Sequence, residues 1–322
     1  MKVLVTGGAG FIGSHLVDTL LKKGHDVTVL DNLETGRKGN FEKHLADNSF
    51  KFVLGNVEDR ELLKKIMKNM DIVFHLAANL QGGGGVSSPL SDFKTNVVGT
   101  FNLLLTARDY DLKRFVYASS VMVYGGRDKI SQSMKEEDNT KLLTPYAASK
   151  LTSEKYCKLF NDIYGLKTVS LRYFNVYGPR VRADNPYAGV INKFINKCVM
   201  KEPMMIYYSG EQTRDFVEFR DVIRATILAS EKDSAVGEII NVGSGVSISI
   251  NKLAKIIYSS FSETNNGIPE PIYGNPPLEE GSRKGYKHAR ADLKKAKKIL
   301  GYEPKIDIKT GIKDLINYYL NS

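Results

Sequence analysis

Tyr146 and Lys150 stand four residues apart in the stretch Tyr146-Ala147-Ala148-Ser149-Lys150. In a helix, residues four apart lie on one face, so the phenol and the ammonium would be neighbours. An ammonium beside a phenol favours the phenolate and lowers the pKa of the tyrosine from about 10 toward neutral pH. Such a tyrosine can act as the general base in the oxidation of an alcohol. The spacing is common by chance, so its meaning depends on the motifs around it.

Two serines, Ser119 and Ser120, follow the predicted strand Arg114–Ala118. In an open α/β sheet, ligands bind at the carboxyl ends of the strands. We therefore expect Ser120 to hydrogen-bond a substrate hydroxyl beside Tyr146 and Lys150. Ser119, its neighbour, is expected to contact a cofactor.

A glycine-rich turn lies at the start of the chain, where Gly7, Gly10 and Gly13 separate the predicted strand Lys2–Thr6 from the predicted helix Ile12–Lys23. Glycine allows a tight turn and lets backbone N–H groups approach a pyrophosphate, and the helix N-terminus adds partial positive charge. Because strand, turn and helix follow in the required order, the motif predicts a dinucleotide site.

The second predicted strand, Asp26–Asp31, ends in a carboxylate 18 residues after Gly13. A carboxylate at this place can accept hydrogen bonds from the adenosine ribose, and it would repel a 2′-phosphate. Asp31 therefore favours NAD over NADP. A simple turn or cap residue is the alternative interpretation.

The elements that would position these residues alternate along the first half of the chain. The predicted strands are Lys2–Thr6, Asp26–Asp31, Phe50–Leu54, Ile72–Leu76, Arg114–Ala118 and Thr168–Tyr173, and the predicted helices are Ile12–Lys23, Arg60–Asn69, Phe93–Asp109 and Ala147–Tyr164. This alternation predicts an α/β fold with a Rossmann-type, doubly wound parallel sheet covered by helices on both faces.

After about Asn175 the alternation stops. Helical patterns at Val190–Met200, Val222–Ser230, Asn251–Phe261, Ala291–Leu300 and Ile308–Leu320 are separated by irregular stretches. We expect a smaller, mixed α/β C-terminal substrate domain at residues 176–322. Residues 1–175 would form the NAD-binding domain, which would also receive a segment of about 213–245.

The chain has 322 residues, 25% of them charged and 42% hydrophobic, which excludes wholesale disorder. Lys and Arg outnumber Asp and Glu by 46 to 36, so an anionic partner is expected. The net positive charge alone does not indicate whether this partner is nucleic acid, a membrane surface or a phosphorylated small molecule.

Cysteine usage and hydropathy exclude several classes. Cys157 and Cys198 have no second cysteine at metal-ligand spacing, so we expect no metal site and two reduced thiols. The chain enters the run Val3-Leu4-Val5 without a signal-peptide pattern, and no apolar run reaches the roughly 18–20 residues that span a bilayer. These features predict a cytoplasmic protein without a membrane partner.

Taken together, the ordered motifs resemble the extended branch of the short-chain dehydrogenase/reductase superfamily, the nucleotide-sugar epimerases and dehydratases typified by UDP-galactose 4-epimerase. The resemblance spans nearly the whole chain. The motifs that carry it are Thr6–Gly13, His75–Ala78, Asn96 with Gly99-Thr100, Ser119-Ser120 with Val123-Tyr124-Gly125, Tyr146–Lys150, Leu171–Asn175, Gln212–Val217, Ala291-Asp292 and Leu300-Gly301-Tyr302.

The resemblance implies a role for each matching position. Ser120, Tyr146 and Lys150 match the catalytic residues of the family. The positions that match NAD contacts are Gly7, Gly10, Phe11, Ile12, Gly13, Asp31, Asn32, Asn56, Val57, Leu76, Ala77, Ala78, Asn96, Ser119, Tyr146, Lys150 and Phe174. Those that match the sugar-nucleotide site are Ser120, Asn175, Arg214 and Arg283.

The resemblance implies that Asn175, Arg214 and Arg283 hold the diphosphate, for which the two guanidinium groups are well suited. A surface ion pair with Asp215 is the alternative for Arg214. For Arg283, the chain departs from the family pattern, because Tyr286 stands where an Asp usually follows the glycine. Eight Lys and Arg within Arg283–Lys298 face one acid, Asp292, so much of the positive charge gathers next to this predicted diphosphate ligand.

Val121 and Met122 limit which reactions of the family we expect this chain to catalyse. In the family, dehydratases carry Asp-Glu at these positions, sugar decarboxylases carry Glu at the second, and GDP-sugar 3,5-epimerases carry Cys there. Valine and methionine exchange no proton with a substrate. We therefore expect an NAD-dependent 4-epimerase, acting first of all on a UDP-hexose, that oxidises C4 and returns the hydride to the opposite face. Gly83 and Gly84, in the run Gly82–Gly85, would leave room for the sugar, although a passive turn is the alternative.

Several alternatives stay open. A C4-dehydrogenase or reductase, or an epimerase of a GDP- or CDP-sugar, fits the same residues. A redox-sensing NAD-binding protein commonly lacks the Tyr/Lys pair that this chain retains, and nucleic-acid binding would need interleaved basic and aromatic residues. Phe93–Asp109 and Ala147–Tyr164 correspond to the helices through which family members form homodimers as a four-helix bundle.

Overall fold

The computed structural model describes residues 1–79, 85–129, 131–181, 189–262, 268–275 and 287–321. Seven strands form one sheet in which every neighbouring pair is parallel. They are β1 (Lys2–Thr6), β2 (Asp26–Asp31), β3 (Phe50–Leu54), β4 (Ile72–His75), β5 (Arg114–Ser120), β6 (Thr168–Tyr173) and β10 (Ile239–Val242). The order across the sheet is β3-β2-β1-β4-β5-β6-β10, so the predicted Rossmann-type sheet is confirmed.

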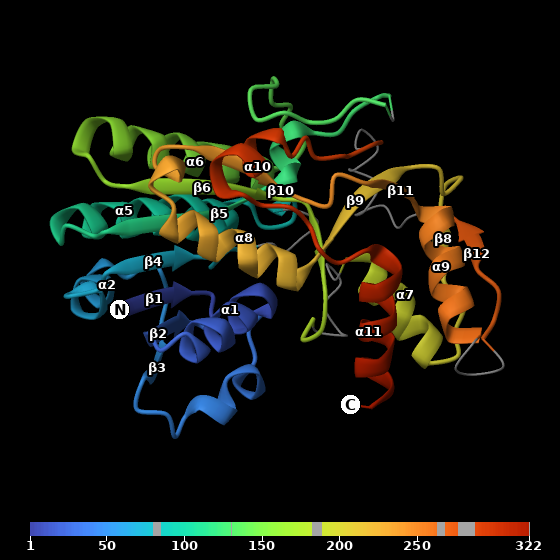
Figure 1. Ribbon diagram of the computed structural model, residues 1–322, viewed down its shortest axis with the longest axis horizontal. Coiled ribbons are helices and arrows are strands. Elements are labelled where there is room, and N and C mark those ends of the chain that lie inside the picture. The colour runs from blue at the N-terminus through green and yellow to red at the C-terminus, as the bar shows by residue number, and fades with distance from the viewer. Residues whose placement is uncertain (80–84, 130, 182–188, 263–267, 276–286, 322) are drawn as a thin grey trace.

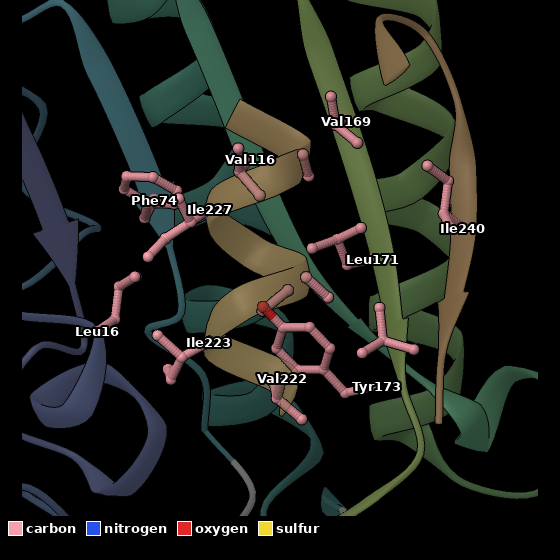
Figure 2. Close-up of a cluster of buried hydrophobic side chains, with 14 of the residues drawn as sticks. Leu16, Phe74, Val116, Val169, Leu171, Tyr173, Val222, Ile223, Ile227 and Ile240 are labelled. Atoms are coloured by element: carbon pink, nitrogen blue, oxygen red, sulfur yellow. The ribbon is translucent and has the colours of Figure 1, made fainter. Parts of the chain in front are cut away.

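Helices cover both faces of this sheet because its strands are apolar on both sides. One face packs against α1 (Phe11–Lys22) and α8 (Phe219–Glu231), and Figure 2 shows Leu16, Val222 and Ile227 of these helices around the strand residues Val116 and Leu171. The other face packs against α2 (Arg60–Met67), α5 (Thr100–Asp109) and α6 (Pro145–Tyr164). Over the residues that the structure describes, no helix is both long and apolar enough to cross a bilayer.

A smaller group of elements lies beside the large sheet, on the right in Figure 1. A three-stranded sheet joins β11 (Ser247–Ser249), β9 (Thr213–Glu218) and β7 (Asn175–Tyr177), and a parallel pair joins β8 (Met205–Tyr207) and β12 (Ile272–Gly274). A separate apolar core there unites α7 (Val190–Val199), α9 (Ile250–Ser262) and α11 (Ile308–Leu320). This mixed α/β part agrees with the architecture expected after Asn175.

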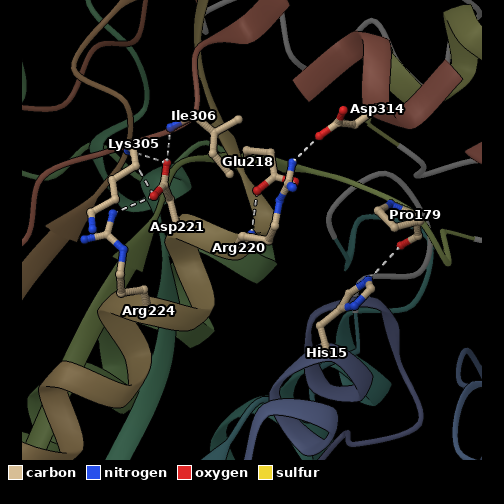
Figure 3. Close-up of polar contacts among 9 residues, drawn as sticks. All are labelled: His15, Pro179, Glu218, Arg220, Asp221, Arg224, Lys305, Ile306 and Asp314. Carbon is tan, nitrogen blue, oxygen red and sulfur yellow. Dashed lines mark hydrogen bonds and ion pairs between the residues drawn. The ribbon is translucent and has the colours of Figure 1, made fainter. Parts of the chain in front are cut away.

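The chain crosses between the two parts more than once. After β9, helix α8 packs on the large sheet, and β10 pairs with β6 at its edge. Polar contacts fix this crossing (Figure 3): Asp221 of α8 accepts hydrogen bonds from the backbone N–H groups of Lys305, at 2.9 Å, and Ile306, at 3.0 Å. On the other side, the His15 ring of α1 lies 3.3 Å from the carbonyl oxygen of Pro179.

Several predicted elements have other bounds in the structure, among them α8, which begins three residues earlier than expected, and α6, which begins two residues earlier. The expected helix Phe93–Asp109 is interrupted, since α4 (Pro89–Phe93) leads into a π-helical segment, Lys94–Gly99, before α5. Strand β5 extends through Ser120 because its last two serines pair with Arg172 and Tyr173 of β6. Helix α10 (Lys294–Leu300) begins three residues later than expected, because Ala291 is engaged in a β-bridge with Met134. Short 3₁₀ turns occupy Lys38–Asn40, Glu42–His44, Val121–Tyr124 and Asp233–Ala235.

Candidate active site

A cleft of about 440 Å³ opens at the carboxyl ends of the strands of the large sheet. Asp31 of β2, Ala118 of β5 and Tyr173 of β6 line it, together with Leu76 just after β4. It therefore lies at the switch point between β1 and β4, where the chain order across the sheet reverses. This is the place at which the sequence predicts a dinucleotide.

The glycine turn between β1 and α1 forms one wall of the cleft. Gly7 has a φ of +72°, and a Cβ atom there would lie 2.7 Å from the backbone nitrogen of Ala77. A Cβ atom on Gly13 would lie 2.1 Å from the carbonyl oxygen of Gly7. The chain is thus packed backbone against backbone, and α1 begins beside the cleft with no acidic residue in its first turn. A turn of this kind fits the diphosphate of a dinucleotide.

Asp31 lies at the end of β2 and lines the cleft. One carboxylate oxygen accepts a hydrogen bond of 3.0 Å from Ala9 N–H, and the other accepts one of 2.8 Å from Leu33 N–H. Burial raises the pKa of this carboxyl group, and the two N–H donors oppose the rise. Next to it, the Asn32 amide donates to the side-chain oxygen of Asn56 at 2.8 Å, so two further predicted residues lie in contact. The geometry suits recognition of a ribose.

Ser120 and Tyr146 meet on the opposite wall. Ser120 ends β5, its side chain hydrogen-bonds the Tyr146 side chain, and its Oγ accepts a hydrogen bond from Met122 N–H. Tyr146 lies in the first turn of α6, which Thr144 caps by accepting a hydrogen bond from Ala147 N–H. Burial raises the pKa of Tyr146, and the hydrogen bond from Ser120 opposes that rise. Both side chains line the cleft.

Lys150 lies one turn further along α6, and its ammonium nitrogen is 5.6 Å from the centre of the Tyr146 ring. It donates a hydrogen bond of 2.7 Å to the carbonyl oxygen of Ala118. Burial lowers the pKa of Lys150 to about 8. The pKa of Tyr146 rises rather than falls, so the expectation that the ammonium lowers it is wrong. Burial is the largest cause of the rise in the pKa of Tyr146, and the charge of Asp92 adds to it.

A buried ion pair supports this wall from behind. Arg172 of β6 donates two hydrogen bonds to Glu154 of α6, at 2.9 and 2.7 Å, and the two side chains are 3% and 0% exposed. Ser119 donates a hydrogen bond to the same carboxylate. Helix α6 is thereby fixed to β5 and β6 at the level of Ser120 and Lys150. Ser119 lines the cleft, but its hydroxyl hydrogen is directed away from it.

The structure brings most of the predicted site residues to the cleft. Those that line it are Gly7, Gly10, Phe11, Ile12, Gly13, Asp31, Asn32, Asn56, Val57, Leu76, Ala77, Ala78, Ser119, Ser120, Tyr146, Lys150, Phe174 and Asn175. Gly83, Gly84 and Arg283 lie outside the described residues.

Two predicted residues are not among those that line the cleft. Asn96 is buried in the π-helical segment, where its amide bonds the backbone of Asn79 at 2.9 and 2.8 Å. Arg214 of β9 donates to the carbonyl oxygens of Thr213 and Lys287, at 2.8 and 3.1 Å. In both cases the side chain hydrogen-bonds backbone groups, and a match to a sequence motif does not reveal toward which groups a side chain points.

Sequence reasoning missed several residues of the cleft. Asn79 follows β4, Val176 and Tyr177 belong to β7, and Arg180 comes shortly afterwards. The signal that could have identified Asn79 is its position after a strand that ends at the ligand-binding edge of the sheet. The β7 residues had no such signal, because a three-residue strand leaves no hydrophobic period in the sequence.

Comparisons with known proteins agree with this geometry. The chain is 39% identical, over 99% of its own length and 99% of the other's, to a protein from Methanocaldococcus jannaschii that carries the provisional name UDP-glucose 4-epimerase. It is 33% identical, over 99% of the chain and 97% of the relative, to the UDP-N-acetyl-alpha-D-glucosaminuronate decarboxylase of Bacillus cytotoxicus.

Among solved structures, the UDP-glucose 4-epimerase of Thermotoga maritima with UDP-glucose is similar with a TM-score of 0.90 and 34% identity, covering 100% of this chain and 99% of that one. The family model described as "NAD dependent epimerase/dehydratase family" matches residues 3–243. The glycine turn, Asp31 and the group of Ser120, Tyr146 and Lys150 share one cleft, and the chain belongs to the NAD-dependent epimerase/dehydratase family.

Proposed function

We propose that this chain is an NAD-dependent nucleotide-sugar 4-epimerase that acts first of all on a UDP-hexose. The observation that carries the proposal is the meeting of Ser120, Tyr146 and Lys150 at one wall of the cleft, with Val121 and Met122 beside them. The similarity to epimerases agrees with it. Similarity alone does not select the reaction, because a decarboxylase is also among the relatives.

The residues of the chain have distinct roles in this proposal. Tyr146 takes the proton of the C4 hydroxyl as the general base, and Ser120 hydrogen-bonds that hydroxyl and orients it. Lys150, held by the Ala118 carbonyl, places its charge near the phenol. When bound, NAD would supply the hydride acceptor for C4 and the hydride donor for the opposite face. Tyr146 then gives its proton back to the C4 oxygen, so the chain ends each cycle as it began.

Val121 and Met122 support epimerisation over the other reactions of relatives. Both line the cleft directly after Ser120, in the 3₁₀ turn Val121–Tyr124. Elimination of water needs an acid or base beside the neighbouring sugar carbons. Neither side chain can exchange a proton, which favours renewed reduction or release of the oxidised sugar over elimination of water.

The remaining site residues are part of the proposal. The glycine turn and α1 would hold the NAD diphosphate, and Asp31 would bind the adenosine ribose. Asn175, which starts β7 and lines the cleft, would contact the nucleotide sugar, and Arg214 and Arg283 would reach its diphosphate. Support for Arg214 comes from its strand, β9, which pairs with the strand that carries Asn175.

The test is epimer formation by the NAD-loaded chain. UDP-glucose, UDP-galactose, their N-acetylated forms and matching GDP- and CDP-sugars are incubated separately, and the products are separated and identified by NMR. We expect C4 epimers without net NADH, and a loss of about 10³-fold in kcat for Tyr146→Phe. Accumulation of stoichiometric NADH would favour a C4-dehydrogenase. A Tyr146→Phe chain that works at the wild-type rate would contradict the mechanism.

A homodimer through α5 and α6 is a further part of the proposal. These helices pack together on one face, with the rings of Phe101 and Tyr156 in edge contact at 5.0 Å. On the outer side of α6, Leu159 is 46% exposed and Ile163 is 65% exposed, four residues apart. A second copy would cover this apolar stripe. Sedimentation should give a dimer at micromolar concentration, and a monomer for Leu159→Glu with Ile163→Glu.

A further inference from the structure

Asp92 is a buried carboxylate that the proposed chemistry does not use. It lies in α4 and is 1% exposed. One oxygen accepts a hydrogen bond of 2.5 Å from the Ser149 hydroxyl, and the other accepts one of 2.8 Å from the Asn96 amide. A buried carboxylate needs such partners, because an unpaired one would be strongly destabilising. Ser149 precedes Lys150 directly, so one of these partners belongs to the catalytic turn of α6.

The other partner, Asn96, connects Asp92 to Asn79, which follows β4. Asn96 accepts a hydrogen bond of 2.9 Å from Asn79 N–H and donates one of 2.8 Å to the Asn79 carbonyl oxygen. Asn79 lines the cleft. Asn96 lies in the π-helical segment, and its own carbonyl accepts a hydrogen bond of 2.8 Å from Ser153 of α6. A local π-helix is rare and often occurs at functional sites.

We propose that Asp92 is a positioning residue that sets the distance between the catalytic turn of α6 and the cleft wall at Asn79, through Ser149 and Asn96. This inference rests on the proposed roles of Tyr146 and Lys150. Because the two links converge on one carboxylate, a displacement of Asp92 would move the catalytic turn of α6 and Asn79 relative to each other. A misplacement of about 1 Å can lower the rate of an enzyme roughly 100-fold.

The chemistry of the two links explains why a carboxylate stands here. Both Ser149 Oγ and Asn96 Nδ2 donate, so the group between them must accept on both sides, and an ionised acceptor forms hydrogen bonds about twice as strong as a neutral one. The charge also acts on the neighbouring lysine: Asp92 raises the pKa of Lys150, against the lowering by burial. An amide would keep the shape of the carboxylate but would present one N–H₂ group to a donor.

The variants follow from this geometry. Asp92→Ala removes both links, Asp92→Asn keeps the shape without the charge, and Ser149→Ala removes one link and leaves the carboxylate in place. The control is Asp221→Ala. Asp221 is also buried, at 2% exposure, and accepts hydrogen bonds from Lys305 and Ile306 far along the chain from the catalytic turn. It has no part in the proposed catalytic site.

The first readout is the turnover of NAD-occupied protein, with NAD content and thermal midpoint measured for every variant. We expect kcat to fall roughly 100-fold in Asp92→Ala, to recover to within about 10-fold of wild type in Asp92→Asn, and to fall less in Ser149→Ala than in Asp92→Ala. Asp221→Ala should lose thermal stability but keep kcat within about twofold. A purely structural role would give both alanine variants the same loss of stability and an unchanged kcat, and that result would overturn the proposal.

The second readout needs no turnover, so that it stays decisive if the proposed function fails. Hydrogen exchange of the backbone amides of residues 148–151 should become at least about 10-fold faster in Asp92→Ala and stay as in wild type in Asp221→Ala. Unchanged exchange in Asp92→Ala would overturn the positioning role, whatever the enzyme does. If wild type forms no epimer from any nucleotide sugar, the function fails and this exchange result alone decides the role of Asp92.

Discussion

The two walls of the cleft are built on different principles. The wall at α1 is made of backbone: Gly7 and Gly13 allow peptide groups to approach each other, and Asp31 is fixed by two N–H donors. The wall at α6 is made of side chains: Lys150, Glu154 and Asp92 are all buried and held by hydrogen bonds. The first wall depends on shape, and the second depends on charges withdrawn from water. Substitutions should therefore act differently on the two.

The largest effect on stability is expected at the α6 wall. Glu154→Ala leaves Arg172 buried without its partner, so the free energy of unfolding should fall by about 3–5 kcal/mol. Urea unfolding followed by circular dichroism measures it. The control is Asp314→Ala, which breaks the exposed ion pair with Arg220 and should change stability by about 1 kcal/mol at most. Equal losses in both variants would contradict the contrast between the walls.

The next effect is a dependence of stability on pH. The pKa of Lys150 is about 8 in the folded chain and near 10.4 when unfolded, so the unfolded state binds more protons between these values. The free energy of unfolding of wild type relative to Lys150→Met should therefore rise with pH from about 8 to 10, by roughly 1–3 kcal/mol. Denaturant titrations of both proteins at pH 7, 8, 9 and 10 measure the difference. A flat difference would show that Lys150 is not withdrawn from water.

At the α1 wall, the expected effect is on cofactor binding. A Cβ atom on Gly13 would meet the Gly7 carbonyl oxygen at 2.1 Å, so Gly13→Ala must displace the turn. Overpacking of this kind costs about 1–3 kcal/mol, which corresponds to a 10- to 100-fold weaker NAD affinity if the turn carries the strain. Calorimetric titration of NAD measures it. Gly39→Ala is the control, because a Cβ atom there would meet nothing within 4 Å.

The smallest effect is expected at Asp31. Asp31→Asn keeps the shape of the side chain but has one acceptor oxygen, so it cannot accept hydrogen bonds from Ala9 N–H, Leu33 N–H and a ribose hydroxyl together. NAD affinity should therefore fall about 10-fold, which corresponds to one weakened hydrogen bond to a charged group. The loss for NADP should be smaller, because the repulsion of its 2′-phosphate is removed. The ratio of the two dissociation constants decides the matter, and an unchanged ratio would remove Asp31 from cofactor selection.

Much of the fold and of the site could be predicted because local patterns encode it. The strand Lys2–Thr6 and the helix Ile308–Leu320 were predicted with their observed bounds, since a short β-branched apolar run marks the strand and a helical hydrophobic pattern marks the helix. The glycine turn and the Ser120, Tyr146 and Lys150 group could be found because a tight turn and a proton transfer each require particular residue types at fixed spacing.

What escaped prediction depends on the packing of distant segments. Burial in the folded chain is the main cause that raises the pKa of Tyr146, so spacing alone gave the wrong direction. The hydrogen bonds between the Asn96 amide and the Asn79 backbone were not predicted, because they join the π-helical segment to the chain that follows β4. The strands β8 and β12 pair across more than 60 residues, and each is three residues long, too short to leave a pattern.

The pairing of β10 with β6 has a consequence for any attempt to divide this protein. A fragment that ends at residue 175 would lack both β10 and α8, so the free edge of β6 would offer unpaired backbone groups over Ser170–Tyr173. Leu171 and Val116 would lose their cover from α8 as well. An open edge next to an exposed apolar face is a template for aggregation. We therefore expect that residues 1–175 do not fold stably by themselves and that stable shorter forms retain residues 213–242.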